Sequence, residues 1–549
     1  MLSPSLQQER AVLLEEMAHI DRMIRGHVSQ QIYQVQRGER TVTQGPYHLL
    51  QRRENGRNNC QRVGADELDF IVQAVEGHDR FQTLAQRYAA LTEQMTWDQQ
   101  GAEIKKKVPA LLAAYFPQTA LCLNRLATQG IGDFAALERE LLAALKHDGA
   151  RWVEQLLNDP TLPGQHQQCL PDEENYGSRP KAVLLTLGWI TLRRPYLYSA
   201  RRGEGRFPLD SALGLVDSYS PEVLRWVCRA AALAGSYQAA SQDLLTYAGL
   251  EIDARQIQRL VRQVAPAMNR WRAAQAPVCN PMAGDIMCVG TDGTGAPMRR
   301  REVRGRKGKK GGRARTREVK VGTVFTHRKP DQPDQRPERD YASTTYLAAI
   351  VTADQFGPLL RAEAIRRGMA KAKVVVFLGD GAVWVWKLAR LNFPNAVYIL
   401  DYYHACEHLN LLSATLYGEG SVLAKRRYRQ WRKALLKDKI AQVIAQAKAD
   451  LPTKAQTRKS AKKQMAYFER NYSKMLYQTF RQAGYFIGSG VVEAGCKTVV
   501  GQRLKQSGML WSRKGASHLL AVRCALLSGW FEDFWKHYNR AAQGLAFAA

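Results

Sequence analysis

Residues 373–401 read KVVVFLGDGAVWVWKLARLNFPNAVYILD, and this stretch decides the fold. Lys373–Asp380 is a continuous apolar run that ends in an acid, as expected of a buried strand. Val383–Leu391 places apolar residues at helical spacing, and Ala396–Asp401 is another apolar run that ends in an acid. A strand, a helix and a strand in this order indicate part of an α/β sheet.

The sequence before this stretch adds three more strands. Asp285–Asp292 (DIMCVGTD) is apolar and ends in an acid, and Val319–His327 and Thr344–Thr352 are rich in β-formers. Gln355–Ala372 has helical spacing. The order is therefore three strands, a helix, a strand, a helix and a strand, which predicts a mixed α/β sheet. Residues 409–480 then follow with a helical and strongly basic pattern.

Three acids stand at similar positions in these predicted elements. Asp292 and Asp380 each end a strand and precede a glycine, and Glu493 begins a helix after the Gly-rich residues 488–490. Ligands collect beyond the carboxyl ends of strands and near helix starts, so the three side chains could converge. Converging carboxylates repel one another unless cations lie between them, and they are hard ligands suited to Mg²⁺ or Mn²⁺. Two such ions roughly 4 Å apart support phosphodiester chemistry. The alternative is that each acid only caps a turn.

The charge balance points to a polyanionic partner. Eighty Lys and Arg against fifty Asp and Glu leave a net charge of +30 in 549 residues. Nucleic acid is the first expectation for such a protein, with solubility or an anionic membrane surface as alternatives. Twelve Lys and Arg lie in Arg299–Lys320, which predicts a flexible solvated loop or a clamp on the phosphate backbone. The candidate contacts there are Arg306, Lys307, Lys309, Lys310 and Arg313.

A second DNA-binding element is predicted upstream of the sheet. Val223–Leu233, Tyr237–Ala248 and Ala254–Val264 read as three helices joined by short Gly-containing turns, the outline of a helix-turn-helix. The third helix would enter the major groove and present Arg255, Gln258, Arg259 and Arg262. A helical hairpin without a role in DNA binding is the alternative.

The first 210 residues carry fewer signals. Residues 1–160 have a mostly helical pattern, as in Leu68–Met95 and Phe134–Leu157, and Gln34–Asn59 reads as a loop or a DNA-contacting arm. Ala182–Leu187 and Ile190–Tyr198 flank Gly188-Trp189 and predict a β-hairpin. Basic residues of this hairpin, Arg194 among them, are candidate DNA contacts.

Two further segments allow more than one interpretation. Asp401–His408 (DYYHACEH) contains H-x-x-E-H, a zinc-protease pattern. Asp401, His404 and His408 could instead support the metal carboxylates through hydrogen bonds, or the histidines could be structural. After Glu493 come Lys497, Arg503, Lys505 and Trp511, which could hold a scissile phosphate or stack on a displaced base. A tryptophan in the core is the alternative for Trp511.

Cysteine usage and hydropathy limit the location. Nine cysteines without a C-x-x-C pair indicate reduced thiols in the cytosol. The N-terminus does not read as a signal peptide, and no run reaches about 18 apolar residues, so we expect no transmembrane helix.

The motifs taken together resemble a known family. CVGTDGTGAP at 288–297, LGDGA at 378–382, LDYYHACEH at 400–408, GSGVVE at 488–493 and SGMLWS at 507–512 are similar to bacterial DDE transposases of the Kra-four insertion-sequence family. The resemblance covers roughly residues 165–530. It implies an RNase H-like core in residues 280–408 and 483–549, interrupted by a helical insertion at 409–482.

The resemblance also implies roles for the residues. Asp292, Asp380 and Glu493 would be the DDE triad and would hold two Mg²⁺ or Mn²⁺ ions. Asp401 and His404 match the C/D-x-x-H signature of Mutator-type transposases. Relatives often carry a Cys-x-x-Cys pair where this chain has Ser199 and Arg202, so zinc is not expected.

The expected protein is a multidomain α+β transposase. A helical domain (1–160) for DNA binding or dimerisation, a degenerate zinc-ribbon-like hairpin (161–215) and a helix-turn-helix (216–275) would precede the core. The protein would bind terminal inverted repeats of double-stranded DNA, hydrolyse a phosphodiester and transfer the strand to target DNA. We expect a homodimer or larger assembly, nucleoid-associated in the cytoplasm and without a membrane partner. The alternatives are a catalytically silent DNA-binding descendant and another RNase H-like nuclease.

Overall fold

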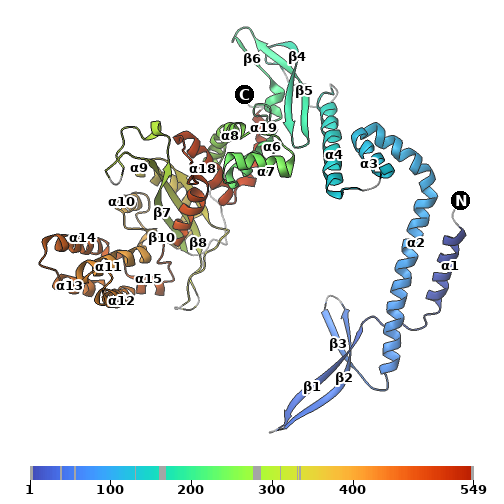
Figure 1. Ribbon diagram of the computed structural model, residues 1–549, viewed down its shortest axis with the longest axis horizontal. Coiled ribbons are helices and arrows are strands. Elements are labelled where there is room, and N and C mark those ends of the chain that lie inside the picture. Colours follow the sequence, from blue (N-terminus) through green and yellow to red (C-terminus); the bar gives the residue numbers. More distant parts are fainter. Residues whose placement is uncertain are drawn as a thin grey trace. The chain divides into compact units, whose positions relative to one another are not determined.

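The computed structural model describes residues 4–37, 40–54, 57–129, 132–159, 169–275, 286–308, 311–330, 332 and 335–545 (Figure 1). The chain divides into two compact units, Met1–Asp148 and Gly149–Ala549. The observed fold is a mixture of helices and several small sheets, which confirms the predicted multidomain α+β class at that level. None of the helices within the described ranges is long and apolar enough to cross a membrane.

The first unit is mostly helical, as predicted, but residues 27–63 form a sheet that the sequence did not predict. The strands β1 (His27–Arg37), β2 (Arg40–Glu54) and β3 (Arg57–Val63) pair antiparallel in sequence order, so Gln34–Asn59 is not a loop, and its role as a DNA-contacting arm stays a prediction. The strands are rich in Gln and Arg, and among the described side chains Leu50 and Val63 pack on Val75 of the following helix. Such a small apolar face gives little period-two signal in the sequence.

Four helices lie before and after this sheet in the chain. They are α1 (Pro4–Ala18), α2 (Leu68–Tyr115), α3 (Pro117–Gln129) and α4 (Phe134–Leu157). Leu13 of α1 packs on Leu84 and Leu91 of α2, and Arg87 bonds to Glu9 at 2.6 Å. The helices predicted at Leu68–Met95 and Phe134–Leu157 are confirmed, and α2 continues beyond Met95 to Tyr115.

The predicted hairpin is confirmed with a shifted turn. Strands β4 (Glu174–Leu185) and β5 (Gly188–Ser199) pair antiparallel, with Leu185 opposite Gly188, so the turn is Thr186-Leu187 rather than Gly188-Trp189. Gly188 has φ +137°, a conformation that favours glycine. A short β6 (Glu204–Arg206) pairs with β5, and α5 (Pro208–Ala212) packs Leu209 on Ile190 and Leu192.

Ser199 and Arg202 bind the two acids that precede β4. The Ser199 hydroxyl donates to Asp172 at 2.7 Å, and Arg202 pairs with Asp172 at 3.0 Å and with Glu173 at 2.7 Å. Arg206 adds a 2.7 Å pair with Glu173. We name Asp172, Glu173, Ser199, Arg202 and Arg206 the hairpin ion cluster. The cluster joins the β5–β6 turn to the segment before β4.

The three helices of the predicted helix-turn-helix are confirmed as helices. They are α6 (Pro221–Leu233), α7 (Tyr237–Ala248) and α8 (Ala254–Ala274). Ser220, Ser236 and Asp253 each cap a helix through the side chain, and Gly249 ends α7 in the left-handed region. Helix α8 runs past the predicted end at Val264 because buried Ala265 and Met268 continue its apolar face.

A five-stranded sheet follows in the predicted order. Its strands are β7 (Ile286–Pro297), β8 (Thr316–His327), β9 (Thr345–Ala349), β10 (Val374–Gly379) and β11 (Val397–Leu400), in the order β11-β10-β7-β8-β9. Strands β7, β10 and β11 are parallel, whereas β8 is antiparallel to both β7 and β9. Helices α9 (Ala353–Arg366) and α10 (Val383–Asn392) connect and cover it.

One predicted boundary is wrong in a way that matters for the site. Strand β7 does not end at Asp292 but continues to Pro297, because β8 pairs with it as far as Thr316. Asp292 therefore lies inside the strand. The basic segment between β7 and β8 is also shorter than predicted and partly ordered, with the short η1 turn (Arg300–Val303) and a bridge between Lys307 and Arg313.

The residues after β11 are helical, as predicted for 409–482, although the first helix already begins at Tyr402; we call this segment the helical insertion. Its helices are α11 (Tyr402–Tyr417), α12 (Val422–Leu436), α13 (Ile440–Ala449), α14 (Ala455–Asn471) and α15 (Tyr477–Gln482). Buried Trp431, Phe468 and Tyr477 join the same core as the sheet residues Phe377 and Ile399. The insertion therefore packs on the sheet.

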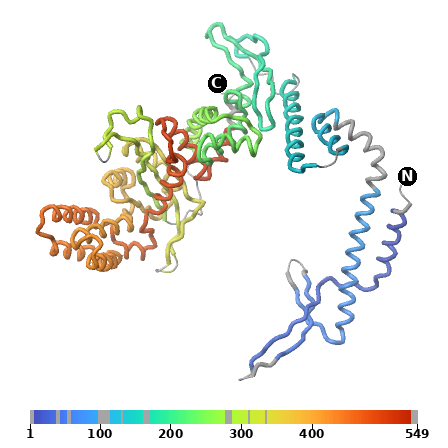
Figure 2. Tube along the Cα trace, viewed as in Figure 1, coloured from blue at the N-terminus to red at the C-terminus, as the bar shows by residue number. Residues whose placement is uncertain are grey.

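The C-terminal segment returns to the first helices of this unit (Figure 2). It comprises α16 (Gly490–Gly495), a π-helix at Cys496–Gly501, α17 (Gln502–Leu504), α18 (Arg513–Leu527) and α19 (Phe531–Leu545). Leu519 of α18, Leu260 of α8 and Val321 of β8 belong to one hydrophobic core. The sheet and helices α6–α8 therefore share one hydrophobic core.

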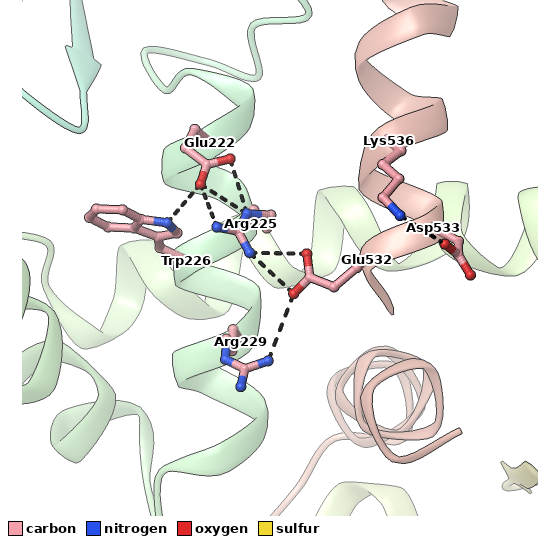
Figure 3. Close-up of polar contacts among 7 residues, drawn as sticks. All are labelled: Glu222, Arg225, Trp226, Arg229, Glu532, Asp533 and Lys536. Carbon is pink, nitrogen blue, oxygen red and sulfur yellow. Dashed lines mark hydrogen bonds and ion pairs between the residues drawn. The ribbon is translucent and has the colours of Figure 1, made fainter. Parts of the chain in front are cut away.

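A surface ion network reinforces this return (Figure 3). The Arg225 guanidinium on α6 bonds to Glu222 of the same helix at 2.6 Å and to Glu532 of α19 at 3.0 Å. Arg229 reaches Glu532 at 3.8 Å, and the Trp226 indole donates to Glu222 at 2.8 Å.

Candidate active site

Three acids lie at the same level of three adjacent parallel strands. In the strand register Leu378 is opposite Gly290 and Gly379 is opposite Leu400. Asp380 stands two residues beyond Leu378, Asp292 stands two residues beyond Gly290, and Asp401 follows Leu400. The predicted convergence of Asp292 and Asp380 at one edge of the sheet is therefore present, although Asp292 is not at a strand end. Asp401 joins them.

The electrostatics of Asp292 reflect this crowding of negative charge. Burial raises the pKa of the Asp292 carboxyl, and the nearby charges of Asp380 and Glu318 raise it further. Hydrogen bonds from the Gly293 amide at 2.5 Å and from the Cys496 thiol at 3.4 Å act in the opposite direction. Burial is the largest of these effects, and the two neighbouring carboxylates act in the same direction.

The backbone around Asp380 leaves no room for a side chain at the next position. Gly381 has φ +93°, and a Cβ there would lie 2.6 Å from the Tyr467 hydroxyl oxygen. That hydroxyl donates to the Asp380 carbonyl at 3.2 Å, while the Asp380 carboxylate accepts from the Ala382 amide at 3.0 Å. The insertion helix α14 therefore fixes the turn that carries Asp380.

Glu493 reaches the same region from a helix packed closely on the sheet. A Cβ on Gly290 of β7 would lie 3.4 Å from Val492, and one on Gly495 would lie 3.0 Å from the Tyr346 ring. Cys496, one turn beyond Glu493, bonds to Asp292. Burial raises the pKa of the Cys496 thiol, and the charges of Asp292 and Glu493 add to the shift. Glu493 itself is exposed.

Asp401 connects its strand to the Glu493 helix. Its side chain is 1 % exposed and accepts hydrogen bonds from the His404 amide at 2.5 Å and from the Ser489 amide. The Ser489 hydroxyl in turn donates to Glu493 at 3.1 Å. A chain of two hydrogen bonds therefore runs from Asp401 to the carboxylate of Glu493.

The histidines of α11 face the insertion. His408 bonds to Gln464 at 2.7 Å and stacks on Tyr467 with ring centroids 3.8 Å apart, and burial lowers its pKa. His404 lies 3.4 Å from Glu407. Within the described ranges, no three His, Cys, Asp or Glu side chains lie close enough together to form a metal-binding group. The zinc-protease interpretation therefore gains no third ligand, and the three predicted triad acids do not close on one point.

Comparison with known proteins does not place the chain in a family. No protein-family model matches it, and no curated protein matches its sequence. The assignment of function therefore rests on the acids, their supports and the distribution of charge.

The predicted DNA contacts on α8 line a cavity of about 470 Å³. Arg255, Gln258, Arg259 and Arg262 form one wall, and Arg299, Arg301 and the start of α18 form another. Arg306 lines a second cavity of about 670 Å³. The Lys505 ammonium donates to Thr294 of β7 at 2.5 Å, near the acids, and Lys497 is exposed. Lys307 and Arg313 pair their backbones, whereas Lys309 and Lys310 lie outside the described residues.

Three predicted DNA contacts are buried, and the structure does not support that role for them. Arg194 pairs with Asp210 at 2.6 Å and lies over the Phe207 ring. Arg503 is fully buried and donates to the Ala231 carbonyl at 2.9 Å. Trp511 is 5 % exposed and donates to the Leu504 carbonyl at 3.0 Å. Burial against apolar neighbours explains all three, which fits the alternative that Trp511 is a core residue.

Four residues near the acids were missed by sequence reasoning. Ser489 lies in the GSGVVE motif but was given no role, whereas Cys496 carries no motif and is brought to Asp292 by helix packing. Glu318 and Lys320 lie on β8 beside β7, joined at 2.8 Å, with the Lys320 ammonium 3.6 Å above the Trp384 ring. The pairing of Gly293 with Lys320 is the signal that could have revealed them.

Proposed function

We propose that the chain is a DNA transposase of an insertion sequence, acting by DDE chemistry at Asp292, Asp380 and Glu493. The observation that carries the proposal is the shared register of Asp292 and Asp380 on β7 and β10, with the Glu493 helix packed on β7. The strand order β11-β10-β7-β8-β9 supports an RNase H-like assignment of the sheet. The resemblance of the acid motifs to Kra-four transposases supports the same assignment.

The donor set fits a divalent cation. Carboxylates are the ligands that Mg²⁺ and Mn²⁺ prefer, and Asp380 and Glu318 lie close enough to Asp292 for their charges to raise its pKa. Asp292, Asp380 and Glu493 would hold one or two such ions. Bound there, the ions would activate water or a 3′-hydroxyl and stabilise the leaving oxygen. Because the three acids do not close on one point, Glu493 would have to turn toward the other two.

The chain's own residues would position this site. Asp401 holds the Ser489 amide, and Ser489 holds one carboxylate oxygen of Glu493. Cys496, protonated because its pKa is raised, donates to Asp292 and leaves the other oxygen of that carboxylate turned to the Gly293 amide. Lys505 stands beside β7, where an ammonium could neutralise a scissile phosphate.

The substrate would be double-stranded DNA. Terminal inverted repeats of the element would be recognised by α6–α8 and the N-terminal unit, hydrolysed at one strand and joined to target DNA through the freed 3′-hydroxyl. The net charge of +30 supports a nucleic-acid partner. Because two ends must be paired, we further propose a homodimer or larger assembly in the nucleoid of a bacterial cytoplasm.

The test is strand cleavage on the protein's own substrate. A plasmid carrying the DNA that flanks the gene is incubated with purified protein in Mg²⁺, Mn²⁺ or EDTA, and breaks are mapped. Metal-dependent breaks at the element ends, absent with Glu493→Gln and retained with Glu419→Gln, are expected. Glu419 is the matched control because it is an exposed glutamate outside the site.

One observation favours a second candidate, a DNA-binding protein without catalysis. The triad acids do not converge among the described residues. This candidate predicts DNA binding that is unchanged by Glu493→Gln and no breaks in either metal. Breaks without joined products would indicate another RNase H-like nuclease.

A further inference from the structure

The two cavities beside α8 adjoin and form one strongly cationic feature. Lys514 and His518 of α18 line both of them, so the cavities share a wall. We call the two together the cationic cleft. The first cavity is lined by six Lys and Arg and one acid, Glu302, and the second by five Lys and Arg and one acid, Glu318. Lys514 belongs to both sets.

Most of these cations form no ion pair with a carboxylate among the residues that the structure describes, although Arg317 donates to the Glu302 carbonyl at 2.8 Å. Arg259 pairs with Asp217 at 3.4 Å, Arg301 with Glu302 at 3.8 Å and Lys320 with Glu318 at 2.8 Å. The remaining lining cations make no ion pair with a described residue; they are Arg255, Arg262, Arg299, Arg306, Arg317, Arg513 and Lys514. Surface arginines elsewhere in this unit, such as Arg225, do find carboxylates.

The cations of the cleft repel one another. Burial lowers the pKa of Arg317, and the charges of Arg306 and Arg513 lower it further. Burial also lowers the pKa of His518, with contributions from Arg262 and Lys514. The His518 Nδ1 atom is buried without a hydrogen-bond partner in the described structure. Clustered cations that are unfavourable alone become favourable when an anion lies among them.

Two helix starts add to this positive field. Helix α18 begins after Ser512 and α9 begins after Thr352, and both cap residues line the cleft. The first turn of a helix carries partial positive charge and free backbone N–H groups, which favour phosphate. Side chains and helix starts therefore point to the same class of ligand.

The cleft ends beside the acids. Glu318 lines the second cavity and also lies close enough to Asp292 to raise its pKa. A Cβ on Gly293, the residue after Asp292, would lie 2.2 Å from the Glu318 carboxylate. A strand bound along the cleft would thus lead from α8 to the edge of the sheet at which Asp292 stands.

We propose that the cationic cleft binds the phosphate backbone of duplex DNA and leads one strand from α8 to Asp292. The proposal rests on the proposed function for the identity of the polyanion. It assigns the α8 arginines to phosphates instead of base edges, because η1 and α18 stand opposite this face of α8. A recognition helix in a major groove needs that face free along the bases.

The test measures duplex binding in EDTA, without cleavage, by fluorescence anisotropy over a range of salt concentrations. The cleft variant is Arg262→Gln with Arg299→Gln. The matched control is Arg270→Gln with Arg300→Gln, which alters the same helix and the same turn outside the cleft. Loss of two phosphate contacts should reduce the slope of log K against log salt by about 2. The control should keep the wild-type slope.

The sequence of the duplex distinguishes phosphate binding from base reading. The cleft variant should weaken binding of the flanking-end duplex and of a scrambled duplex by the same factor. A loss confined to the end duplex would overturn the proposal, as would an unchanged salt slope. Tighter binding of an RNA duplex than of DNA would also overturn it.

A second measurement uses the unmodified protein, so misfolding of a variant cannot decide the outcome. Arginines are labelled with phenylglyoxal with and without duplex, and the labelled residues are found by mass spectrometry. Arg255, Arg262 and Arg299 should be protected by DNA, whereas Arg270 and Arg300 should not. The proposal would be overturned if Arg255, Arg262 and Arg299 were labelled equally with and without DNA. It would also be overturned if inorganic phosphate protected these arginines equally well and DNA did not displace the phosphate. Protection by DNA without any metal-dependent cleavage would support the cationic cleft as a DNA-binding site and contradict the proposed transposase activity.

Discussion

Two clusters of acids in the second unit have opposite electrostatics. In the hairpin ion cluster, hydrogen bonds from Arg206 outweigh burial and hold the pKa of Glu173 at about 2. At the sheet edge, burial and neighbouring acids raise the pKa of Asp292. Arginines outweigh burial in the first cluster, whereas burial and neighbouring acids prevail at Asp292. Perturbed pKa values of the second kind are associated with functional sites, which supports the proposed metal site.

The largest effect is expected from substitutions at the sheet-edge acids, and its absence would contradict this comparison. Asp292→Asn or Glu493→Gln should reduce the proposed metal-dependent DNA cleavage by about 10⁴-fold or more, because either removes a proposed metal ligand. Glu173→Gln should leave cleavage within about threefold of wild type per folded protein, since it stands in a structural cluster. Rates of plasmid nicking, corrected for the folded fraction, measure the difference. Equal losses in the two clusters would contradict it.

Asp401 tests whether support of Glu493 passes through Ser489. Asp401→Asn replaces one of two acceptor oxygens by an amide, which cannot accept from the Ser489 amide while the other oxygen serves His404. We expect a loss of about 10–100-fold in cleavage, of the size seen when supports of metal ligands are removed. The Mg²⁺ concentration for half-maximal rate should rise as well. A loss of rate at unchanged metal dependence would argue against this positioning role.

Stability should respond in opposite directions in the two clusters. Glu173→Gln should lower the free energy of unfolding by about 1–3 kcal/mol, because two arginines lose charged hydrogen bonds. In EDTA, Asp292→Asn should fall within about 0.5 kcal/mol of wild type or above it, because it removes a charge that burial and neighbouring acids disfavour. Urea unfolding measures both, with Arg201→Gln as the exposed control in the same turn. Destabilisation by both acid variants would show that the distinction is false.

The smallest effect is a difference in pH dependence. Because the folded pKa of Glu173 is about 2 and its ordinary value is 4.5, its contribution is complete above about pH 4.5. It is lost as the pH falls toward 2. Asp292 has a raised folded pKa, so its protonated form favours folding at acid pH and stability declines as the pH rises through that pKa. Urea midpoints from pH 2 to pH 6 should show a shallower acid loss in Glu173→Gln than in wild type.

The sheet and its acids were accessible from sequence because each depends on local pattern. The apolar runs before Asp380 and Asp401 predict strands, and adjacent parallel strands bring their ends together. The helices α6, α7 and α8 were equally clear, since Ser220, Ser236 and Asp253 cap them at the predicted starts. These features need no knowledge of distant contacts.

Other features depend on contacts between distant residues and gave no local signal. The sequence left Trp511 open as a DNA contact or a core residue, and only its packing decides, because its indole bonds inside the core beside Tyr237. Cys496 lies 204 residues from Asp292, and only the packing of Val492 on Gly290 brings them together. The sheet at residues 27–63 was missed because Gln and Arg cover most of its surface. The RNase H-like and helix-turn-helix assignments stay predictions.

Two buried arginines limit how this protein can be divided. Arg503 bonds to the carbonyl of Ala231, and Arg523 bonds to those of Ala232 and Val499, so the last turn of α6 is satisfied from the segment after Glu493. Residues 216–275 are therefore not a detachable module. If these helices were exchanged for those of another protein, the carbonyls of Ala231 and Ala232 would lose their donors in the transplanted helices. The guanidinium groups of Arg503 and Arg523 would stay buried without these acceptors in the recipient protein. Under the proposed function, new DNA preferences would have to arise by point substitution at the surface.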